Sequence, residues 1–182
     1  MIANSDRSGY FGASDTAYIL GNTQTKTFRK WWLEKMGIPP KKFTNVAMLA
    51  GTHFEHRILD KINVVSRDRQ FINEALKIRV NLDGDKDGCI YEVKTYKSDK
   101  PFKMPKKYIE QVQVQMFVSG MRTAKIVVYK LLESDYKNFF AEIEMDRITI
   151  IDIPYDEEFI NNKYLPRVTY FAECLERGII PQ

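Results

Sequence analysis

The segment Asn81–Thr95 constrains the fold more than any other part of the sequence. An acidic, glycine-containing turn leads there into a run of residues that favour a β-strand. Successive side chains of a strand point to opposite faces, so Glu92 and Lys94 project together while Val93 projects to the other side. Asp83, at the start of the turn, brings a second carboxylate close to this pair. The segment therefore predicts a strand that carries an acid and a lysine on one face.

This combination of groups has a definite chemical use. Asp83 and Glu92 offer oxygen ligands to Mg²⁺, and the ammonium group of Lys94 could orient or deprotonate an attacking water. Two hard oxygen ligands and one amine are the minimum for metal-assisted hydrolysis of a phosphodiester. The segment thus makes metal-dependent chemistry on a phosphate the first hypothesis.

Two other interpretations of the segment compete with a catalytic one. Asp83, Asp85 and Asp87 copy the first half of a calcium-binding loop, but Lys94 stands at the twelfth position, where such loops have a glutamate. The other alternative is a plain polar hairpin in which Glu92 and Lys94 form an exposed charge pair. The segment alone does not separate this hairpin from a site.

The charge is distributed unevenly along the chain. Lysine and arginine number 28 against 24 aspartate and glutamate, a formal net charge of +4. Residues 26–42 and 94–107 each hold six basic residues and one acid, whereas residues 133–158 hold nine acids and two basic residues. Solvated helix surface would explain such runs, but both basic runs flank the candidate acids. We expect a polyanion to meet one face of the protein.

The remaining composition excludes several classes of protein. Cys89 and Cys174 are far apart in unlike contexts, which supports neither a disulfide framework nor a zinc or iron–sulfur cluster. No apolar run approaches the ~20 residues of a membrane span, and the first residues lack the apolar core of a signal peptide. We expect a cytoplasmic protein with no membrane partner.

The hydrophobic periodicity predicts an α/β fold with a central mixed β-sheet flanked by α-helices, formed by residues 1–182 as a single domain. Helices are predicted near 15–20, with Ser14 as N-cap, and at 27–36, 44–64, 105–119 and 156–177, the last kinked or interrupted at Pro166. Strands are predicted at 69–71, 76–82 and 89–96, as a meander, and at 125–132 and 138–151.

Two of the predicted helices carry residues of further interest. Glu55 shares a stripe of three- and four-residue spacing with Met48 and Leu59, an apolar setting that favours a role beyond surface solvation. Trp31 and Trp32 stand among basic residues, but core packing explains them better than base stacking does.

Several short motifs follow one another in a fixed order along most of the chain. They are Gly-Ala-Ser-Asp at 12–15, Trp-Trp-Leu-Glu-Lys-Met-Gly at 31–37, Gly-Thr-His-Phe-Glu at 51–55, Asp-Gly at 83–84 with Glu-Val-Lys at 92–94, and Gln-Val-Gln-Val-Gln-Met at 111–116. Together they resemble the PD-(D/E)XK nuclease superfamily and, within it, the YqaJ-type viral recombinase family of the phage lambda exonuclease type. One departure is Leu82, where that family commonly has proline, so Asp85 stays a candidate accessory ligand beside Asp83.

The resemblance implies a restriction-endonuclease-like core and a set of metal ligands. One or two Mg²⁺ or Mn²⁺ ions would be bound by Glu55, Asp83, Glu92 and the carbonyl oxygen of Val93. Lys94 would position the attacking water. Gln111 would support the site through hydrogen bonds to water or to Lys94, although a solvated or capping glutamine is an open alternative.

The resemblance also implies how DNA is held. Arg7 and Ser14 correspond to an arginine and a serine that grip a terminal 5′-phosphate, and Lys35 and Tyr108 are further candidates for DNA contact. A helix N-terminus with a hydroxyl and a guanidinium group does form an anion site, but capping alone would also explain Ser14.

These expectations lead to one favoured function and two alternatives. The favoured one is a Mg²⁺-dependent exonuclease that degrades the 5′-ended strand of duplex DNA and leaves 3′ single-stranded tails for recombination. The alternatives are an endonuclease for single-stranded or branched DNA with the same site, and a non-catalytic protein that binds DNA ends. By analogy the expected partners are duplex DNA ends, two further copies in a ring trimer and a single-strand-annealing protein, in the cytoplasm of a phage-infected bacterium.

Overall fold

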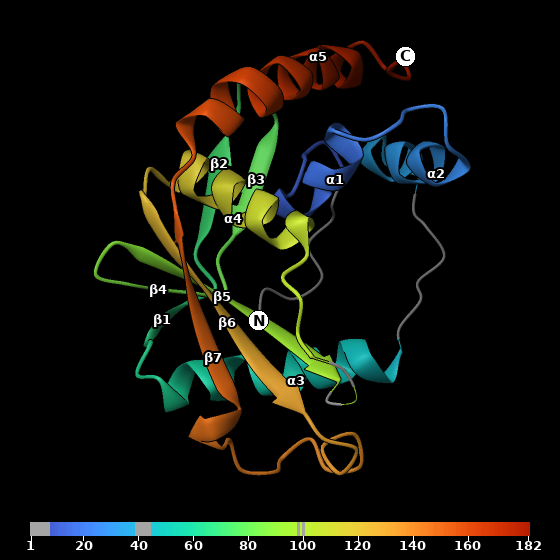
Figure 1. Cartoon of the computed structure of the whole chain (residues 1–182). Coiled ribbons are helices and arrows are strands. Elements are labelled where there is room, and N and C mark those ends of the chain that lie inside the picture. Colours follow the sequence, from blue (N-terminus) through green and yellow to red (C-terminus); the bar gives the residue numbers. More distant parts are fainter. Residues whose placement is uncertain (1–7, 39–44, 98, 100) are drawn as a thin grey trace.

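A computed structural model describes residues 8–38, 45–97, 99 and 101–182 of the chain (Figure 1). Within these ranges the sheet at the centre has five strands in the order β1 (Ser66–Arg67), β4 (Gly84–Lys86), β5 (Cys89–Lys97), β6 (Thr123–Leu131) and β7 (Ile148–Pro154). Only β5 and β6 run parallel, and the other neighbours are antiparallel. The sheet is therefore mixed, and helices flank it, which confirms the predicted fold class.

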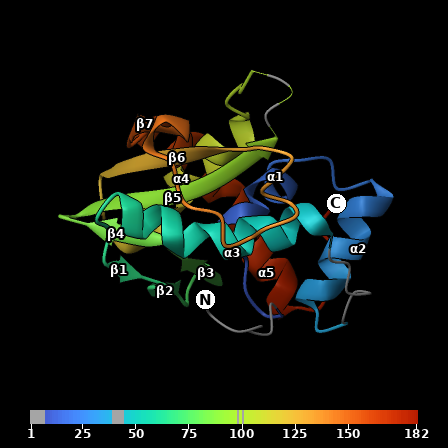
Figure 2. The same ribbon diagram turned by 90° about the horizontal axis from the view of Figure 1, so that it is seen from below.

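Helices cover the two faces of this sheet (Figures 1 and 2). Alternate residues of β6 divide between them: Val127 and Tyr129 pack with α3 (Val46–Lys61), whereas Ala124 and Ile126 pack with α4 (Lys106–Ser119). α4 is the crossover that the parallel pair β5–β6 requires. Its C-terminus ends at Gly120, whose φ of 78° is the left-handed conformation that glycine adopts without strain.

A second apolar cluster joins the N-terminal segment to the last helix. It contains the 3₁₀-helix η1 (Ala13–Asp15), α1 (Thr16–Ile19), α2 (Lys26–Lys35), the hairpin β2 (Gln70–Asn73) with β3 (Ile78–Asn81), and the final pair η3 (Phe159–Tyr164) and α5 (Leu165–Glu176). Trp31 and Trp32 are 6% and 0% exposed at its centre, where Phe28 and Phe171 contact them. The prediction that both tryptophans belong to the core is confirmed.

The acidic turn forms a different hairpin from the one predicted. Gly84 begins β4 instead of closing a turn, and the two-residue turn is Asp87-Gly88, with φ values of 51° and 74°. Positive φ at both positions is the geometry that a tight antiparallel hairpin prefers. Gly84 is required for a separate reason, because a Cβ there would lie 2.8 Å from Cγ1 of Val64. β2 and β3 form their own two-stranded sheet, so the predicted single meander is wrong.

Two other predicted elements also need correction. Residues 138–144 are not part of a strand, because the guanidinium group of Arg57 on α3 binds the carbonyl oxygens of Phe139, Phe140 and Ala141 and holds them as a loop. The 3₁₀-helix η2 (Met145–Arg147) follows, and only then does β7 begin. The closing helix changes from the π-helical turn η3 to the α-helix α5 at Leu165, directly before Pro166, so the predicted interruption near this proline takes the form of a π-helical turn within a continuous helix.

Candidate active site

Asp83 and β5 meet where the hairpin ladder ends. β4 pairs with β5 only as far as Tyr91, so the N–H of Val93 has no strand partner on that side. Oδ2 of Asp83 accepts that N–H at 2.8 Å. The turn carboxylate is thereby fixed against the strand that carries Glu92 and Lys94. The structure places the backbone of Val93 at the site, and the role of its carbonyl oxygen as a ligand stays a prediction.

Glu92 is almost completely buried, with 2% of its surface exposed, and its charge is compensated by side chains of two elements. Nζ of Lys94 lies 2.6 Å from Oε1, and Nε2 of Gln111 donates to the same oxygen at 2.5 Å. Nε2 of Gln115, one turn further along α4, donates to Oε2 at 2.7 Å. The carboxylate is consequently held on both of its oxygens before any ligand arrives.

Gln111 differs in detail from its predicted role. The expectation was a hydrogen bond to water or to Lys94, whereas the structure directs its amide to Glu92. Tyr108, one turn earlier on α4, places its ring 5.0 Å from Nζ of Lys94. The lysine is thus held between a carboxylate and an aromatic face.

Burial and charge act against each other at Lys94. Burial alone would lower its pKa, but the negative charges of Glu92 and Asp83 outweigh burial, so the pKa is raised. The side chain is therefore an ammonium group at neutral pH. An ammonium donates hydrogen bonds and compensates negative charge, which favours orienting a water over deprotonating it.

The negative charge of Glu92 raises the pKa of two nearby carboxyl groups, those of Glu55 and Asp83. Burial, followed by the charge of Glu92, raises the pKa of Glu55 to about 7. Burial, again followed by Glu92 and then Glu55, raises the pKa of Asp83 well above its usual range, and Lys94 only partly opposes this. Acids that destabilise one another in this way are relieved by a divalent cation, so the donor set fits a hard ion such as Mg²⁺ or Mn²⁺.

The stripe that first drew attention to Glu55 is only partly apolar. Met48 is 53% exposed, and α3 packs through Ala50, Phe54, Ile58 and Leu59. Glu55 lies beside this buried face with 28% of its side chain exposed. Its position near the other acids is the result of where α3 crosses the sheet, which periodicity alone does not specify.

His56 and Asp68 were missed by the sequence analysis. Together with Glu55 they place one potential ligand atom each within 4.8 Å of the others, and Nε2 of His56 lies 3.1 Å from Oδ2 of Asp68. Asp68 lies in a bend after β1 and no motif marks it. The adjacent Glu55-His56 pair was the only signal that could have suggested this group.

Asp85 is occupied by other interactions. Its carboxylate is 7% exposed, accepts a hydrogen bond from Ser66 at 2.8 Å and pairs with Arg69 at 2.9 Å. These partners anchor β4 to β1, which gives Asp85 a structural explanation. Neither a calcium loop nor an accessory ligand is needed to account for it.

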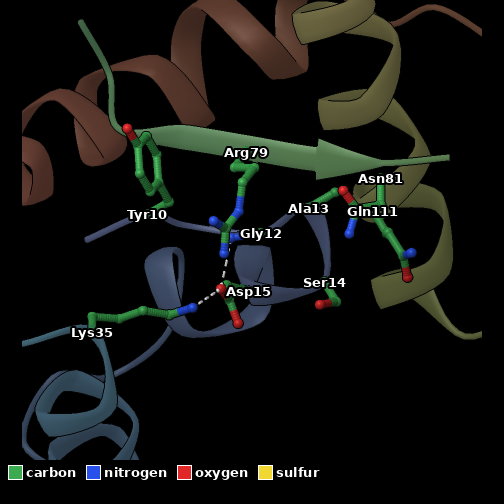
Figure 3. Close-up of a pocket in the computed structure, with 9 residues that line it drawn as sticks. All are labelled: Tyr10, Gly12, Ala13, Ser14, Asp15, Lys35, Arg79, Asn81 and Gln111. Carbon is green, nitrogen blue, oxygen red and sulfur yellow. Dashed lines mark hydrogen bonds and ion pairs between the residues drawn. The ribbon is translucent and has the colours of Figure 1, made fainter. Parts of the chain in front are cut away.

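A polar cavity of about 150 Å³ lies next to this site (Figure 3). It is lined from the N-terminal segment, α2, β3 and α4 by Tyr10, Gly12, Ala13, Ser14, Asp15, Lys35, Arg79, Asn81 and Gln111. Gln111 reaches both places, since it lines the cavity and donates to Glu92. The cavity and the acidic cluster are thus immediate neighbours.

Two of the residues predicted to bind phosphate or DNA, Ser14 and Lys35, line this cavity. Ser14 is exposed and lines it, while Lys35 reaches it as a buried ammonium group 2.6 Å from Oδ2 of Asp15. Arg7 lies outside the described residues. Arg79, which sequence reasoning did not select, adds a guanidinium group that stacks on the ring of Tyr10 at 5.2 Å. In the sequence, only the alternation of Arg79 with the apolar residues Ile78 and Val80 along a predicted strand could have pointed to this arginine.

Ser14 is not the N-cap that was predicted. The cap position is Gly12, and the Asp15 side chain turns back to accept the Gly12 N–H at 2.7 Å. Asp15 also accepts from Nε1 of Trp31 at 2.9 Å, so its carboxylate organises the turn. This arrangement leaves the Ser14 hydroxyl free of a capping role.

The fold and the clustered acids indicate the structural class to which the protein belongs. Over nearly its full length the chain shares the fold of an alkaline exonuclease from Laribacter hongkongensis, with 20% identity, a TM-score of 0.68, and 94% of this chain and 90% of that chain covered. A phage-related exonuclease from Haemophilus somnus 129PT gives 15% identity, a TM-score of 0.68, and coverage of 93% and 96%. The architecture is therefore that of exonucleases.

The family follows from the sequence itself. The model of the YqaJ-like viral recombinase domain matches residues 4–122, and the chain belongs to this family, as the motifs predicted. A comparison with curated proteins gives no match. In the part of the chain that the structure describes, no helix is long and apolar enough to cross a membrane.

Proposed function

We propose that this protein is a divalent-metal-dependent nuclease that degrades the 5′-ended strand of duplex DNA and leaves 3′ single-stranded tails for recombination. One observation carries the proposal: Glu92, paired with Lys94, lies among mutually destabilising acids directly beside a cavity with cationic groups. Membership of the YqaJ-like family and the exonuclease fold support the hydrolase class. The protein acts on phosphodiesters as a nuclease. Degradation of the 5′-ended strand is the more specific claim that we add as a proposal.

Glu55, Asp83 and Glu92 would hold one or two Mg²⁺ or Mn²⁺ ions, with the Val93 carbonyl oxygen as a further ligand. Such an ion lowers the pKa of a bound water and neutralises charge on the scissile phosphate. Lys94 donates hydrogen bonds to the attacking water, and its own position is set by Glu92 and by the ring of Tyr108. Gln111 and Gln115 donate hydrogen bonds to the two oxygens of Glu92.

The adjacent cavity supports an exonuclease over an endonuclease. Ser14, Lys35 and Arg79 present a hydroxyl and two cationic groups, a combination that suits a terminal phosphate. Lys35 forms an ion pair with Asp15, which lines the same cavity. A strand whose 5′-phosphate sits there would present a phosphodiester near its own end to the acidic cluster. An internal site on DNA has no terminal phosphate to place in the cavity.

The substrate would lie along the surface that leads from the site to the start of α4. Lys107 is exposed, and its Nζ lies 5.4 Å from the ring of Tyr108. Sequence-independent contacts of lysine with the DNA backbone position a duplex without reading its bases. We therefore expect cleavage without base specificity and with strong dependence on salt.

The test is cleavage of a duplex labelled internally and at one 3′ end, carrying either a 5′-phosphate or a 5′-hydroxyl. Reactions contain Mg²⁺, Ca²⁺ or EDTA, with Lys94→Ala as the inactive variant and Lys97→Ala as its matched control. Lys97 lies on the same strand, is 54% exposed and pairs with Glu133, away from Glu92. We expect mononucleotides from the phosphorylated 5′ end in Mg²⁺ only, with Lys97→Ala fully active.

Other results would change the assignment. Cleavage that ignores the 5′ terminus would replace the exonuclease with an endonuclease. Binding of DNA ends without cleavage in Mg²⁺ or Mn²⁺ would refute catalysis. A ring trimer and a single-strand-annealing partner are the assembly we propose by analogy, and light scattering of the purified protein, alone and with DNA, measures the first directly.

A further inference from the structure

Gln115 contacts Glu92 from a position that is completely buried. Its side chain is 0% exposed, and Nε2 lies 2.7 Å from Oε2 of Glu92 and 3.1 Å from the main-chain oxygen of Asn81. Asn81 is the last residue of β3 and precedes Asp83 by two positions. One amide group therefore links the segment that carries Asp83 to the acid on β5.

Two of the three glutamines of α4 donate hydrogen bonds to Glu92, each to a different oxygen. Gln111 is only half-buried, lines the polar cavity and shares Oε1 with Lys94. Gln115 is the side chain that reaches Oε2. A carboxylate with donors on one oxygen only can still turn about its last bond, whereas donors on both oxygens fix its plane.

Packing alone does not call for a glutamine at position 115. Within the described residues, Oε1 of Gln115 is buried and has no hydrogen-bond partner, which is unfavourable for an amide oxygen. An apolar side chain of similar length would fill the space without this unsatisfied atom. The reverse orientation of the amide would point Oε1 at the Glu92 carboxylate, so the acid determines which end of the amide faces it.

We propose that Gln115 is a positioning residue for metal binding: it fixes the orientation of Glu92 and the distance from Glu92 to the Asn81–Asp83 segment. The proposal rests on the proposed function, because it takes Glu92 and Asp83 as metal ligands. Ligands held in place in advance bind an ion without first having to be ordered, and partners that orient ligands commonly change metal affinity or activity by 10- to 100-fold.

Gln113 provides a matched control on the same helix. It is 3% exposed, its Nε2 donates to the Pro154 carbonyl oxygen at 2.8 Å, and its Oε1 accepts the Asp156 N–H at 2.7 Å. These bonds hold the junction between β7 and η3 and do not involve Glu92. Gln113→Met and Gln115→Met thus remove equally buried amides with different partners.

The experiment is calorimetric titration of Mn²⁺ into the wild type and both variants without DNA, at a temperature where all three are folded. We expect the Kd of Gln115→Met to rise about tenfold and that of Gln113→Met to stay within twofold of the wild type. Excess Mg²⁺ should restore cleavage by Gln115→Met but not by Lys94→Ala, because only the former retains every reacting group.

A measurement on the wild type covers the case in which Gln115→Met does not fold. The side-chain NH₂ resonances of Gln111 and Gln115 should shift during a Mg²⁺ titration, while those of Gln113 should not. Wild-type Mn²⁺ affinity in Gln115→Met, equal weakening in Gln113→Met, or unshifted Gln115 resonances would each overturn the positioning role. A wild type that neither binds Mn²⁺ nor cleaves DNA would instead overturn the proposed function.

Discussion

Replacing Glu55 by glutamine should stabilise the metal-free protein at alkaline pH. The pKa of this carboxyl is raised from 4.5 to about 7, because it is buried and faces Glu92. The folded protein therefore binds more protons than the unfolded chain between these two values, and its stability falls as the pH rises from about 4.5 to about 7. Glutamine keeps the size of the side chain and removes the charge.

The expected size follows from the same values. A shift from 4.5 to about 7 corresponds to about 3 kcal/mol once the group is fully ionised. Since 28% of the Glu55 side chain is exposed, water screens part of this, and we expect Glu55→Gln to gain about 1–3 kcal/mol at pH 8. Near pH 4.5, where Glu55 is protonated in the folded state, the gain should disappear.

Urea unfolding in EDTA from pH 4.5 to pH 8 measures this difference. Glu142→Gln is the matched control, because it makes the same chemical change at a side chain that is 88% exposed. Adding Mg²⁺ at pH 8 should reverse the order, since a bound ion stabilises only the wild type with its full set of acids. A gain for Glu55→Gln that is independent of pH would refute the electrostatic argument, and a gain that grows with Mg²⁺ would refute the assignment of Glu55 as a ligand.

Three further predictions test other parts of the molecule. Lys94→Ala should lower the rate of cleavage by at least about 100-fold while leaving DNA binding intact, as single-turnover kinetics and a filter-binding assay would reveal. Ser14→Ala should reduce the preference for a 5′-phosphate over a 5′-hydroxyl by about tenfold in kcat/KM, and an unchanged preference would remove Ser14 from the cavity's function. Gly84→Ala should destabilise the fold by about 1–3 kcal/mol in urea unfolding, because the new Cβ would lie 2.8 Å from Val64. Gly51→Ala is the control and should be neutral or stabilising, because its Cβ would meet Thr95 at an ordinary 3.7 Å. Equal effects of the two substitutions would contradict the packing argument.

Local rules predicted the elements whose signals lie within a few residues. The alternation along β5 correctly separates Glu92 and Lys94 from Val93, and the helices predicted at 27–36 and 105–119 agree with α2 and α4 to within one residue at each end. The motifs that define the family are also local in sequence. For these parts, residue order and short-range physics are sufficient.

Features that depend on distant partners were not predictable from the sequence. The loop at 139–141 has the composition of a strand, but Arg57 takes up its carbonyl oxygens. Asp68 joins Glu55 and His56 only because β1 returns past α3. Gln115 belongs to the glutamine-rich motif at 111–116, but the motif does not reveal that its amide contacts Glu92 on a strand far away in the sequence.

The grip of Arg57 on the loop after β6 has a consequence for how this protein can diverge. The three hydrogen bonds from its guanidinium group to this loop go to main-chain oxygens, which every amino acid supplies, so these bonds do not depend on the side chains at positions 139–141. Phe140, with 77% of its surface exposed, can therefore change without releasing the loop from the helix that carries Glu55. Substitutions at this exposed position can therefore change the surface while the arginine preserves the course of the main chain.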